Sequence, residues 1–227
     1  MQILSKLSLF LFIVLGVNSY GQNVSGQIDG HDYVDLGLPS GTLWATCNVG
    51  TSKPTENGDY FAWGETNPKI DYSLSTYKWS NGEKDCETKY SYKNKCGIVD
   101  KKTILTSEDD AATANWGPSW RMPTMDEEME LLEGCDWEWT SDFKETGVAG
   151  DIGISKSNGC MIFLPAPGKY YGQIFEYKGD IGYYWSSTLN IGYNSTNAMN
   201  IINGDLYIDL SNTERYMGLS VRAVVKE

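Results

Sequence analysis

Short runs of alternating or clustered apolar residues fill the second half of the chain, a pattern typical of β-strands. The runs lie at 135–140, 152–155, 161–164, 183–187, 198–202, 206–210 and 219–225. Turn-forming residues at 165–168 and 203–205 separate some of them. Shorter runs at 33–36, 43–47 and 60–63 predict further strands near the N-terminus. We therefore expect a β-rich C-terminal half.

The last strand alternates apolar and polar residues over 220–224. We expect it to pair with the strand near Tyr33. That pairing would bring the two ends of the domain together, as is common in single compact domains.

A helical pattern interrupts the strands, first at 107–116. Ser107 or Thr106 would cap this helix, and Gly117-Pro118 would end it. The acidic residues at 108–110 then occupy the first turn, where the helix dipole favours negative charge. We prefer this interpretation to a calcium site, because calcium ligands are spread around a loop.

A second helix is predicted at 125–133. Pro123 fixes its own φ, and Thr124 can form a capping box with Glu127. Residues at i, i+4 and i+7 would form the buried face, namely Met125, Met129 and Leu132. The expected solvated face carries Asp126, Glu127, Glu128 and Glu130. Carboxylates on such a face give no reason to expect acid–base catalysis.

Between about residues 66 and 103 the chain becomes polar and rich in Lys, Asp and Glu. We interpret this segment as an insertion that forms a long surface loop. A solvated insertion and a ligand-facing loop are both consistent with the pattern, since long ordered loops often carry function.

The N-terminal residues have the pattern of a secretory signal. Lys6 precedes an apolar run at 7–17, and small or polar residues follow it. We predict a signal peptide at 1–21, a short lead at 22–30 and a single domain at 31–227. The run is shorter than the ~20 residues of a membrane-spanning helix. The mature chain is thus expected to be exported, to the periplasm, the cell surface or the medium, without a membrane span.

Composition narrows the choice of partners. The net charge is −12, which disfavours nucleic acid and anionic membranes, because both bind cationic patches. Aromatic residues make up 13% of the chain, with 8 Trp and 15 Tyr, so some aromatic side chains are available for binding as well as for a core.

Five cysteines in an exported chain predict disulfides, with one thiol left over. Cys86 and Cys96 bracket a short polar loop and form the first candidate pair. Cys47 and Cys135 flank apolar segments and form the second, which would leave Cys160 free and buried. No C-x-x-C motif occurs and His31 is the single histidine, so we expect no zinc site and no other cofactor.

Seven strings, taken in order, closely resemble the Fibrobacter succinogenes major paralogous domain, a family abundant in exported proteins of Bacteroidota. They are HDYVDLGLPSG at 31–41, WATCNVG at 44–50, GDYFAWGET at 58–66, WRMPT at 120–124, FLPA at 163–166, YWSS at 184–187 and SVR at 220–222. The resemblance spans about residues 31 to 225. It implies an α+β fold similar to the C-type lectin-like domain and to formylglycine-generating enzymes. Such a fold has two short helices, a small twisted antiparallel sheet, long irregular loops and paired termini.

The resemblance does not bring a known activity with it. Sugar-binding C-type lectins hold calcium with Glu-Pro-Asn or Gln-Pro-Asp and Trp-Asn-Asp, whereas the string at 65–68 is in the wrong order and Trp-Asn-Asp does not occur. Formylglycine-generating oxidases need a closely spaced cysteine pair late in the fold, but Cys160 is the last cysteine here. A Ser-His-Asp triad would depend on His31 alone.

The remaining candidates are aromatic. Five tyrosines in or beside Gly-rich loops are candidate ligand-facing residues: Tyr170, Tyr171, Tyr177, Tyr183 and Tyr193. Five other residues are expected to support the fold: Trp120, Arg121, Pro123, Thr124 and Trp185. We expect a non-enzymatic binding module whose loops recognise a glycan or a protein. A display domain with no single ligand is the alternative, and an enzyme of unknown type is the third, which no sequence feature favours.

Overall fold

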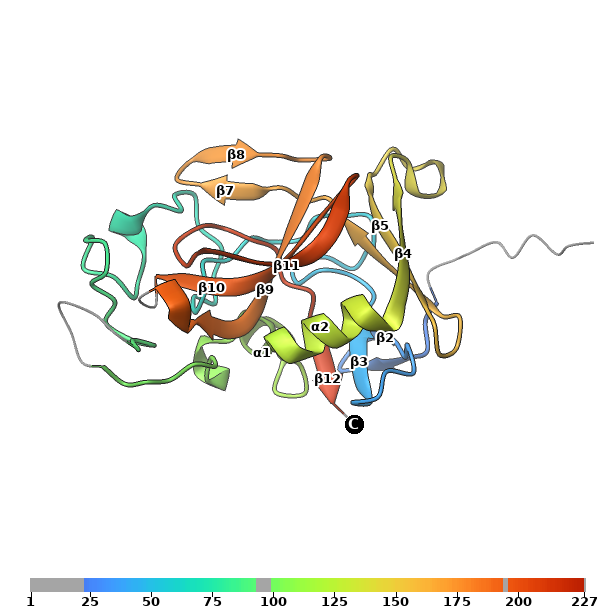
Figure 1. Cartoon of the computed structure of the whole chain (residues 1–227), viewed down its shortest axis with the longest axis horizontal. Helices are drawn as coiled ribbons and strands as arrows, with labels where there is room; N and C mark the ends of the chain where they lie inside the picture. Colours follow the sequence, from blue (N-terminus) through green and yellow to red (C-terminus); the bar gives the residue numbers. More distant parts are fainter. Residues whose placement is uncertain (1–22, 93–98, 194–195, 227) are drawn as a thin grey trace, which may run out of the picture.

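The computed structural model describes residues 23–92, 99–193 and 196–226, and it consists mostly of antiparallel sheets with two α-helices (Figure 1). The helices are α1 (Ala111–Trp116) and α2 (Met125–Gly134). The strands are β1 (Gly26–Ile28), β2 (His31–Val34), β3 (Thr42–Ala45), β4 (Cys135–Thr140), β5 (Gly150–Ser155), β6 (Met161–Pro165), β7 (Lys169–Tyr171), β8 (Ile174–Glu176), β9 (Ile181–Asn190), β10 (Asn197–Gly204), β11 (Tyr207–Glu214) and β12 (Val224–Lys226). Short 3₁₀ turns lie at Leu74–Thr76, Ser107–Asp109, Phe143–Glu145 and Ile191–Tyr193. An α+β or mainly-β small domain is compatible with this composition.

The strands form four sheets, with the orders β1-β2-β3-β12, β11-β10-β9, β4-β5-β6 and β7-β8. The closing strand β12 pairs with β3, Val224 opposite Trp44, and not with β2 near Tyr33. β3 lies between β2 and β12. Its four residues are all buried, so its backbone N–H and C=O groups need partners on both edges, and the two neighbouring strands supply them. The two ends of the described chain still share one sheet, with β12 (red) beside β3 (blue) in Figure 1.

β3 separates two hydrophobic cores, because alternate residues of a strand face opposite sides. Leu43 and Ala45 join a cluster that contains Trp63, Trp120 and Trp185. Trp44 faces the other cluster, which α2 closes with Leu131. The sheet that holds the chain ends is therefore covered on both sides.

The predicted disulfide between Cys47 and Cys135 is wrong, since both residues are free thiols. Cys47 belongs to the first core and donates its thiol to the carbonyl of Thr51, whereas Cys135 belongs to the second core. Cys160 is free as expected, but it is half-buried rather than buried. Cys96 lies outside the described residues, so its pairing with Cys86 stays a prediction.

The first predicted helix is shorter than expected. Ser107–Asp109 forms a 3₁₀ turn, and α1 starts only at Ala111. The N-cap is Asp110, whose carboxylate accepts from the backbone of Thr113 and also from Met122, so neither Ser107 nor Thr106 caps the helix. Asp110 therefore lies at the start of the helix, where negative charge is favoured, whereas Glu108 and Asp109 belong to the 3₁₀ turn before it; Asp109 and Asp110 are both buried.

α2 begins where the sequence predicts, but it buries a different face from the predicted one. Thr124 and Glu127 form the capping box. The buried residues are Glu128 and Leu131, however, while Met129 is 41% exposed. Glu127 is half-buried and paired with Arg121, so the prediction that Glu127 and Glu128 are solvated is wrong.

The polar insertion at 66–103 is held against the body of the protein at the left of Figure 1. Within its described part, Tyr72, Tyr77 and Tyr90 are buried. The Tyr77 hydroxyl donates to the carbonyl of Trp63 at 2.7 Å, and the Tyr90 hydroxyl donates to Asp109 at 2.6 Å. The interpretation as a merely solvated loop is therefore wrong for this part.

The described residues contain no helix that is both long and apolar enough to cross a membrane.

Candidate functional site

Three adjoining open hollows share lining residues, and we refer to them together as the groove. The middle hollow, of about 440 Å³, shares Gly147, Ala149 and Gly179 with one neighbour. It shares Asp180 and Asp205 with the other. Each of these two neighbours has a volume of about 340 Å³. Much of the lining comes from the turns between β4 and β5, β8 and β9, and β10 and β11. These turns lie at the upper side of Figure 1.

The groove combines aromatic rings with polar groups. Trp139 is half-buried in the middle hollow, and Tyr207, 53% exposed, lies at one end. Thr55, Asn57 and Ser141 contribute hydroxyl and amide groups. The charged lining residues are Glu56, Asp180, Asp205 and Lys178. All four charged residues are exposed, so the groove is acidic and open to water.

A buried polar pair joins the two sheets beneath the groove. Asn203 of β10 donates its amide to the carboxylate of Asp151 of β5 at 3.1 Å and approaches the carbonyl of Leu164 at 3.3 Å. Asp151 lies directly opposite Trp139 in the β4–β5 pair. Burial raises the pKa of Asp151 to about 6, with a further contribution from the charge of Asp205. This hydrogen bond therefore fixes the position of β4, which carries Trp139, relative to the turn between β10 and β11, which carries Asp205.

Gly182 makes this junction possible. It pairs with Asn203 across β9 and β10, and a Cβ at this position would collide with the amide oxygen of Asn203. A larger residue would push Asn203 away from Asp151.

Two of the predicted tyrosines, Tyr177 and Tyr183, lie close to each other. Their ring centroids are 6.3 Å apart, and the Lys169 ammonium lies 5.7 and 4.8 Å from them. Burial raises the pKa of Tyr183 to about 12. Tyr177 is exposed and Tyr183 is buried, and neither is among the residues that line the groove.

Tyr170 and Tyr171 belong to a different surface. Tyr170 stacks on Phe175 at 4.6 Å and on Tyr72 at 5.4 Å, and it is half-buried. Tyr171 is exposed and faces Tyr216 at 6.3 Å. Tyr193 ends a 3₁₀ turn, and its side chain lies outside the description. The five predicted tyrosines thus do not form one cluster.

The residues expected to support the fold lie within it. Trp120 and Trp185 are fully buried, and their indoles donate to the carbonyls of Ile28 and Phe61. Arg121 donates to the carbonyl of Met122 and forms a bidentate pair with Glu127 at 2.7 and 2.5 Å. Burial opposes the charge of Glu127, but hydrogen bonds from Arg121 and Thr124 lower its pKa to about 2. Pro123 is buried and accepts from the backbone of Ser187.

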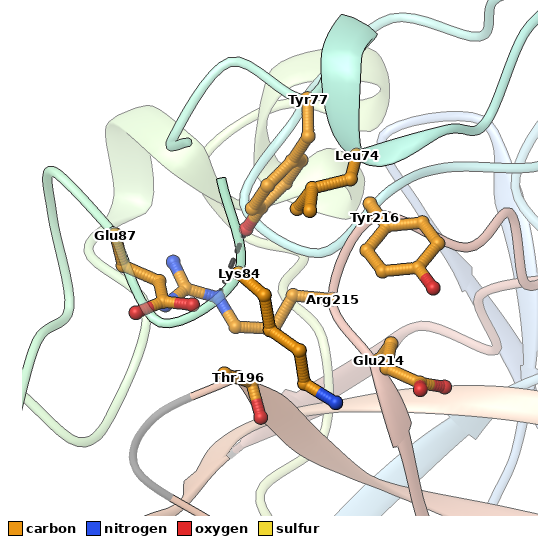
Figure 2. A pocket seen from close by; sticks show the side chains of 8 residues that line it. All are labelled: Leu74, Tyr77, Lys84, Glu87, Thr196, Glu214, Arg215 and Tyr216. Atoms are coloured by element: carbon orange, nitrogen blue, oxygen red, sulfur yellow. Dashed lines mark hydrogen bonds between the residues drawn. The ribbon is translucent and has the colours of Figure 1, made fainter. Parts of the chain in front are cut away.

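A second, smaller pocket of about 60 Å³ surrounds Arg215 (Figure 2). Lys84, Glu87, Glu214 and Tyr216 are among its lining residues. The Arg215 guanidinium donates to the Tyr77 hydroxyl at 2.9 Å and to the carbonyls of Tyr90 and Lys89. Since these donors point at the insertion, we interpret the pocket as the joint that fixes the insertion.

His31 has a packing role. Its ring stacks on Trp116 at 3.9 Å and meets Trp120 edge-on at 6.1 Å. Burial lowers its pKa, although Asp29 and Asp32 oppose this. Across the described ranges, no three His, Cys, Asp or Glu residues are grouped so that they could hold a metal ion.

No sequence pattern marks the groove as a unit. Its lining comes from turns far apart in the chain, and Trp139 and Tyr207 occupy ordinary strand positions. Comparisons with protein-family models, curated proteins and solved structures found no match for this chain. A function can therefore be proposed only from the residues that line the groove.

Proposed function

We propose that this chain is an exported, non-enzymatic binding module that holds a glycan in the groove. The supporting observation is that three open hollows share lining residues, with Trp139 in the middle hollow and Tyr207 in a neighbouring one. Adjoining hollows suit successive units of a linear ligand. Aromatic rings can pack on the apolar faces of sugar rings, while nearby amide, hydroxyl and carboxylate groups bond their hydroxyls.

The charge of the groove narrows the glycan class. Three of the described lining residues are acidic, namely Glu56, Asp180 and Asp205, and one is a cation, Lys178. The whole chain carries −12. Uronic acids and sulfated sugars would be repelled. The ligand is therefore an uncharged glycan or one that contains amino sugars.

The exposure of the acidic groups supports binding over catalysis. Asp180, Asp205 and Glu56 stand on exposed turns, in contact with water. Acid–base catalysis by carboxylates needs a carboxyl whose pKa is raised near the reacting atoms. Asp151 has a raised pKa, but its carboxyl is engaged by Asn203 and is buried beneath the groove.

We also propose membership of the Fibrobacter succinogenes major paralogous family, with a C-type lectin-like fold. The features in support are two short helices, extended irregular segments and a sheet that contains both the first and the last strand. These features agree with the resemblance but occur in other folds as well, so the glycan proposal does not depend on it.

The experiment is a binding screen of the mature chain, residues 22–227, against immobilised glycans of three charge classes. We expect binding to neutral or amino-sugar oligosaccharides and none to polygalacturonate or heparin. Trp139→Ala should weaken binding about 10-fold or more, since a stacked ring contributes on the order of 1 kcal/mol beyond its buried area. The matched control is Tyr171→Ala, because Tyr171 is exposed but lies away from the groove. Preferential binding of the anionic polymers would contradict the proposal.

A protein ligand is the second candidate, and the β7–β8 hairpin favours it. This hairpin exposes Tyr171 (46%), Ile174 (61%) and Phe175 (38%). Neighbouring exposed apolar residues often mark a protein-binding surface. Binding lost in Tyr171→Ala and retained in Trp139→Ala would select this candidate.

A further inference from the structure

The middle hollow of the groove lies between two walls. One wall is the β4–β5 hairpin, and the other consists of the turns before β9 and after β10. The strands of the two walls belong to different sheets. A molecule that fills the hollow therefore contacts both walls and opposes their separation.

Asp151 and Asn203 connect these walls in the interior. Asp151 lies two residues after Ala149 of one wall, and Asn203 lies two residues before Asp205 of the other. The side chains of Asp151 and Asn203 are hydrogen-bonded at 3.1 Å. Asp151 is 3% exposed, and Asn203 is fully buried. Separation of the walls would therefore break this hydrogen bond and admit water to the carboxyl.

The surroundings of Asp151 favour its neutral, protonated form. β4 and β6 place side chains opposite it that do not titrate. The titratable groups that interact with it from the other wall and from β9 are the carboxyl of Asp205 and the phenol of Tyr184. Neither of these groups is a cation, and the Asn203 amide alone favours the charged form. Burial is the larger effect and raises the pKa of Asp151 to about 6.

We infer that the proton on Asp151 controls the groove: the protonated side chain keeps the two walls together around a bound glycan, and loss of the proton releases the glycan. This inference rests on the proposed function and adds the regulation of that site.

The direction of this control follows from hydration. A buried carboxylate gains hydration when the walls separate, so deprotonation favours the open groove. A ligand that contacts both walls favours the protonated form in return, because the coupling between two binding events is reciprocal. Affinity for the glycan should therefore be highest below the folded pKa of Asp151 and fall as pH rises through it.

The test is the glycan affinity of the mature chain at pH 5 and pH 7.5, measured by calorimetry with the oligosaccharide selected by the screen. The wild type should bind about 5- to 10-fold more weakly at pH 7.5, as expected if binding raises the pKa of Asp151 from about 6 to about 7. Asp151→Asn has a similar shape but cannot ionise, so its two affinities should agree within about 2-fold.

Glu138→Gln is the matched control. Glu138 is an exposed carboxyl on β4 that does not line the groove. This variant should keep the pH dependence of the wild type. Loss of the pH dependence in Glu138→Gln would assign the effect to surface charge and overturn the inference.

A second measurement needs no ligand. Trp139 lies opposite Asp151, so its indole NMR signal should titrate with a midpoint near pH 6 in the free wild type and stay constant in Asp151→Asn. An indole signal that does not titrate in the wild type, or an equal pH dependence of affinity in wild type and Asp151→Asn, overturns the inference alone. If the wild type binds no glycan at either pH, the proposed function fails and the inference fails with it.

Discussion

At the scale of single residues, Glu128 is the least expected feature. Its side chain on α2 is fully buried, and neither carboxyl oxygen makes a hydrogen bond of normal geometry with the described residues, although the backbone N–H of Ile201 is near enough to oppose part of the pKa shift. Burial therefore raises the pKa of Glu128 well above its ordinary value of 4.5. A buried polar group without a partner destabilises a fold by about 1–3 kcal/mol.

Glu128→Met should stabilise the protein at pH 8. Because the folded state holds the Glu128 proton more tightly, the stability from this group is complete below pH 4.5 and is lost as pH rises through the folded pKa. We expect the methionine variant to gain about 1–3 kcal/mol at pH 8 and less at pH 4. Urea unfolding at both pH values measures this, with Met129→Ala as a control on the exposed face. An unchanged pH dependence would show that Glu128 does not titrate as described.

At the scale of elements, one buried cation helps to hold the insertion as part of the domain. Arg215 is 1% exposed, and its guanidinium lies 4.8 Å from the ring centroid of Trp63. Its hydrogen bonds reach Tyr77, Lys89 and Tyr90, all within the insertion. Lysine carries the same charge but cannot make these planar, divergent bonds.

Arg215→Lys should loosen the insertion more than the rest of the protein. We expect faster hydrogen exchange in peptides that cover 72–92, while peptides from β4 to β6 stay protected. Lys53→Ala, which removes an exposed ion pair with Glu56, is the control and should change neither region. Equal loss of protection everywhere would mean that Arg215 supports the whole core rather than this segment.

The sequence predicted those elements that depend on local signals. β4 has the predicted bounds, and α2 begins with the predicted capping box, since both follow from neighbouring residues. The predicted buried face of α2 was wrong, because faces that contain Met129 or Leu131 fit the helical period equally well. Tertiary packing decides which of these faces is buried. The β7–β8 hairpin was missed because its two strands have three residues each.

At the scale of the whole molecule, the groove crosses the junction of two sheets that share no backbone pairing. The side chains of Asn203 and Asp151 form a hydrogen bond across this junction, and both residues are buried. Tyr184 adds a second tie, since its hydroxyl donates to the carbonyl of Pro165 at 2.6 Å. The shape of the groove therefore depends on a few polar bonds in the interior.

Asp151→Asn should stabilise the protein above pH 6. The folded pKa is about 6 and the ordinary value is 3.8, so the stability from Asp151 is complete below pH 3.8 and is lost as pH rises through 6. At ~1.4 kcal/mol per pH unit, this interval corresponds to about 3 kcal/mol. Thermal unfolding at pH 3.5 and pH 8 should show the gain only at pH 8. Asp205→Asn, on the exposed turn, is the control; an equal gain there would assign the effect to general charge reduction.

The candidate site was only partly predictable. Of the predicted tyrosines, Tyr171 and Tyr177 are exposed and Tyr183 is buried, and none of the three lines the groove. Trp139 and Tyr207 were missed because they lie in strands, and a sequence does not reveal which strand ends meet. Separating Tyr171 from Tyr177 likewise required the fold, since only five positions lie between the two residues.

The location of a bound glycan tests the central claim most directly. Amide and indole NMR signals should be followed while the oligosaccharide selected by the screen is added to the mature chain. We predict that the largest shifts fall on the Trp139 indole and on the backbone of Ala149, Gly179 and Asp205. Shifts confined to the β7–β8 hairpin at Tyr171 and Phe175, or spread evenly over the surface, would contradict the account.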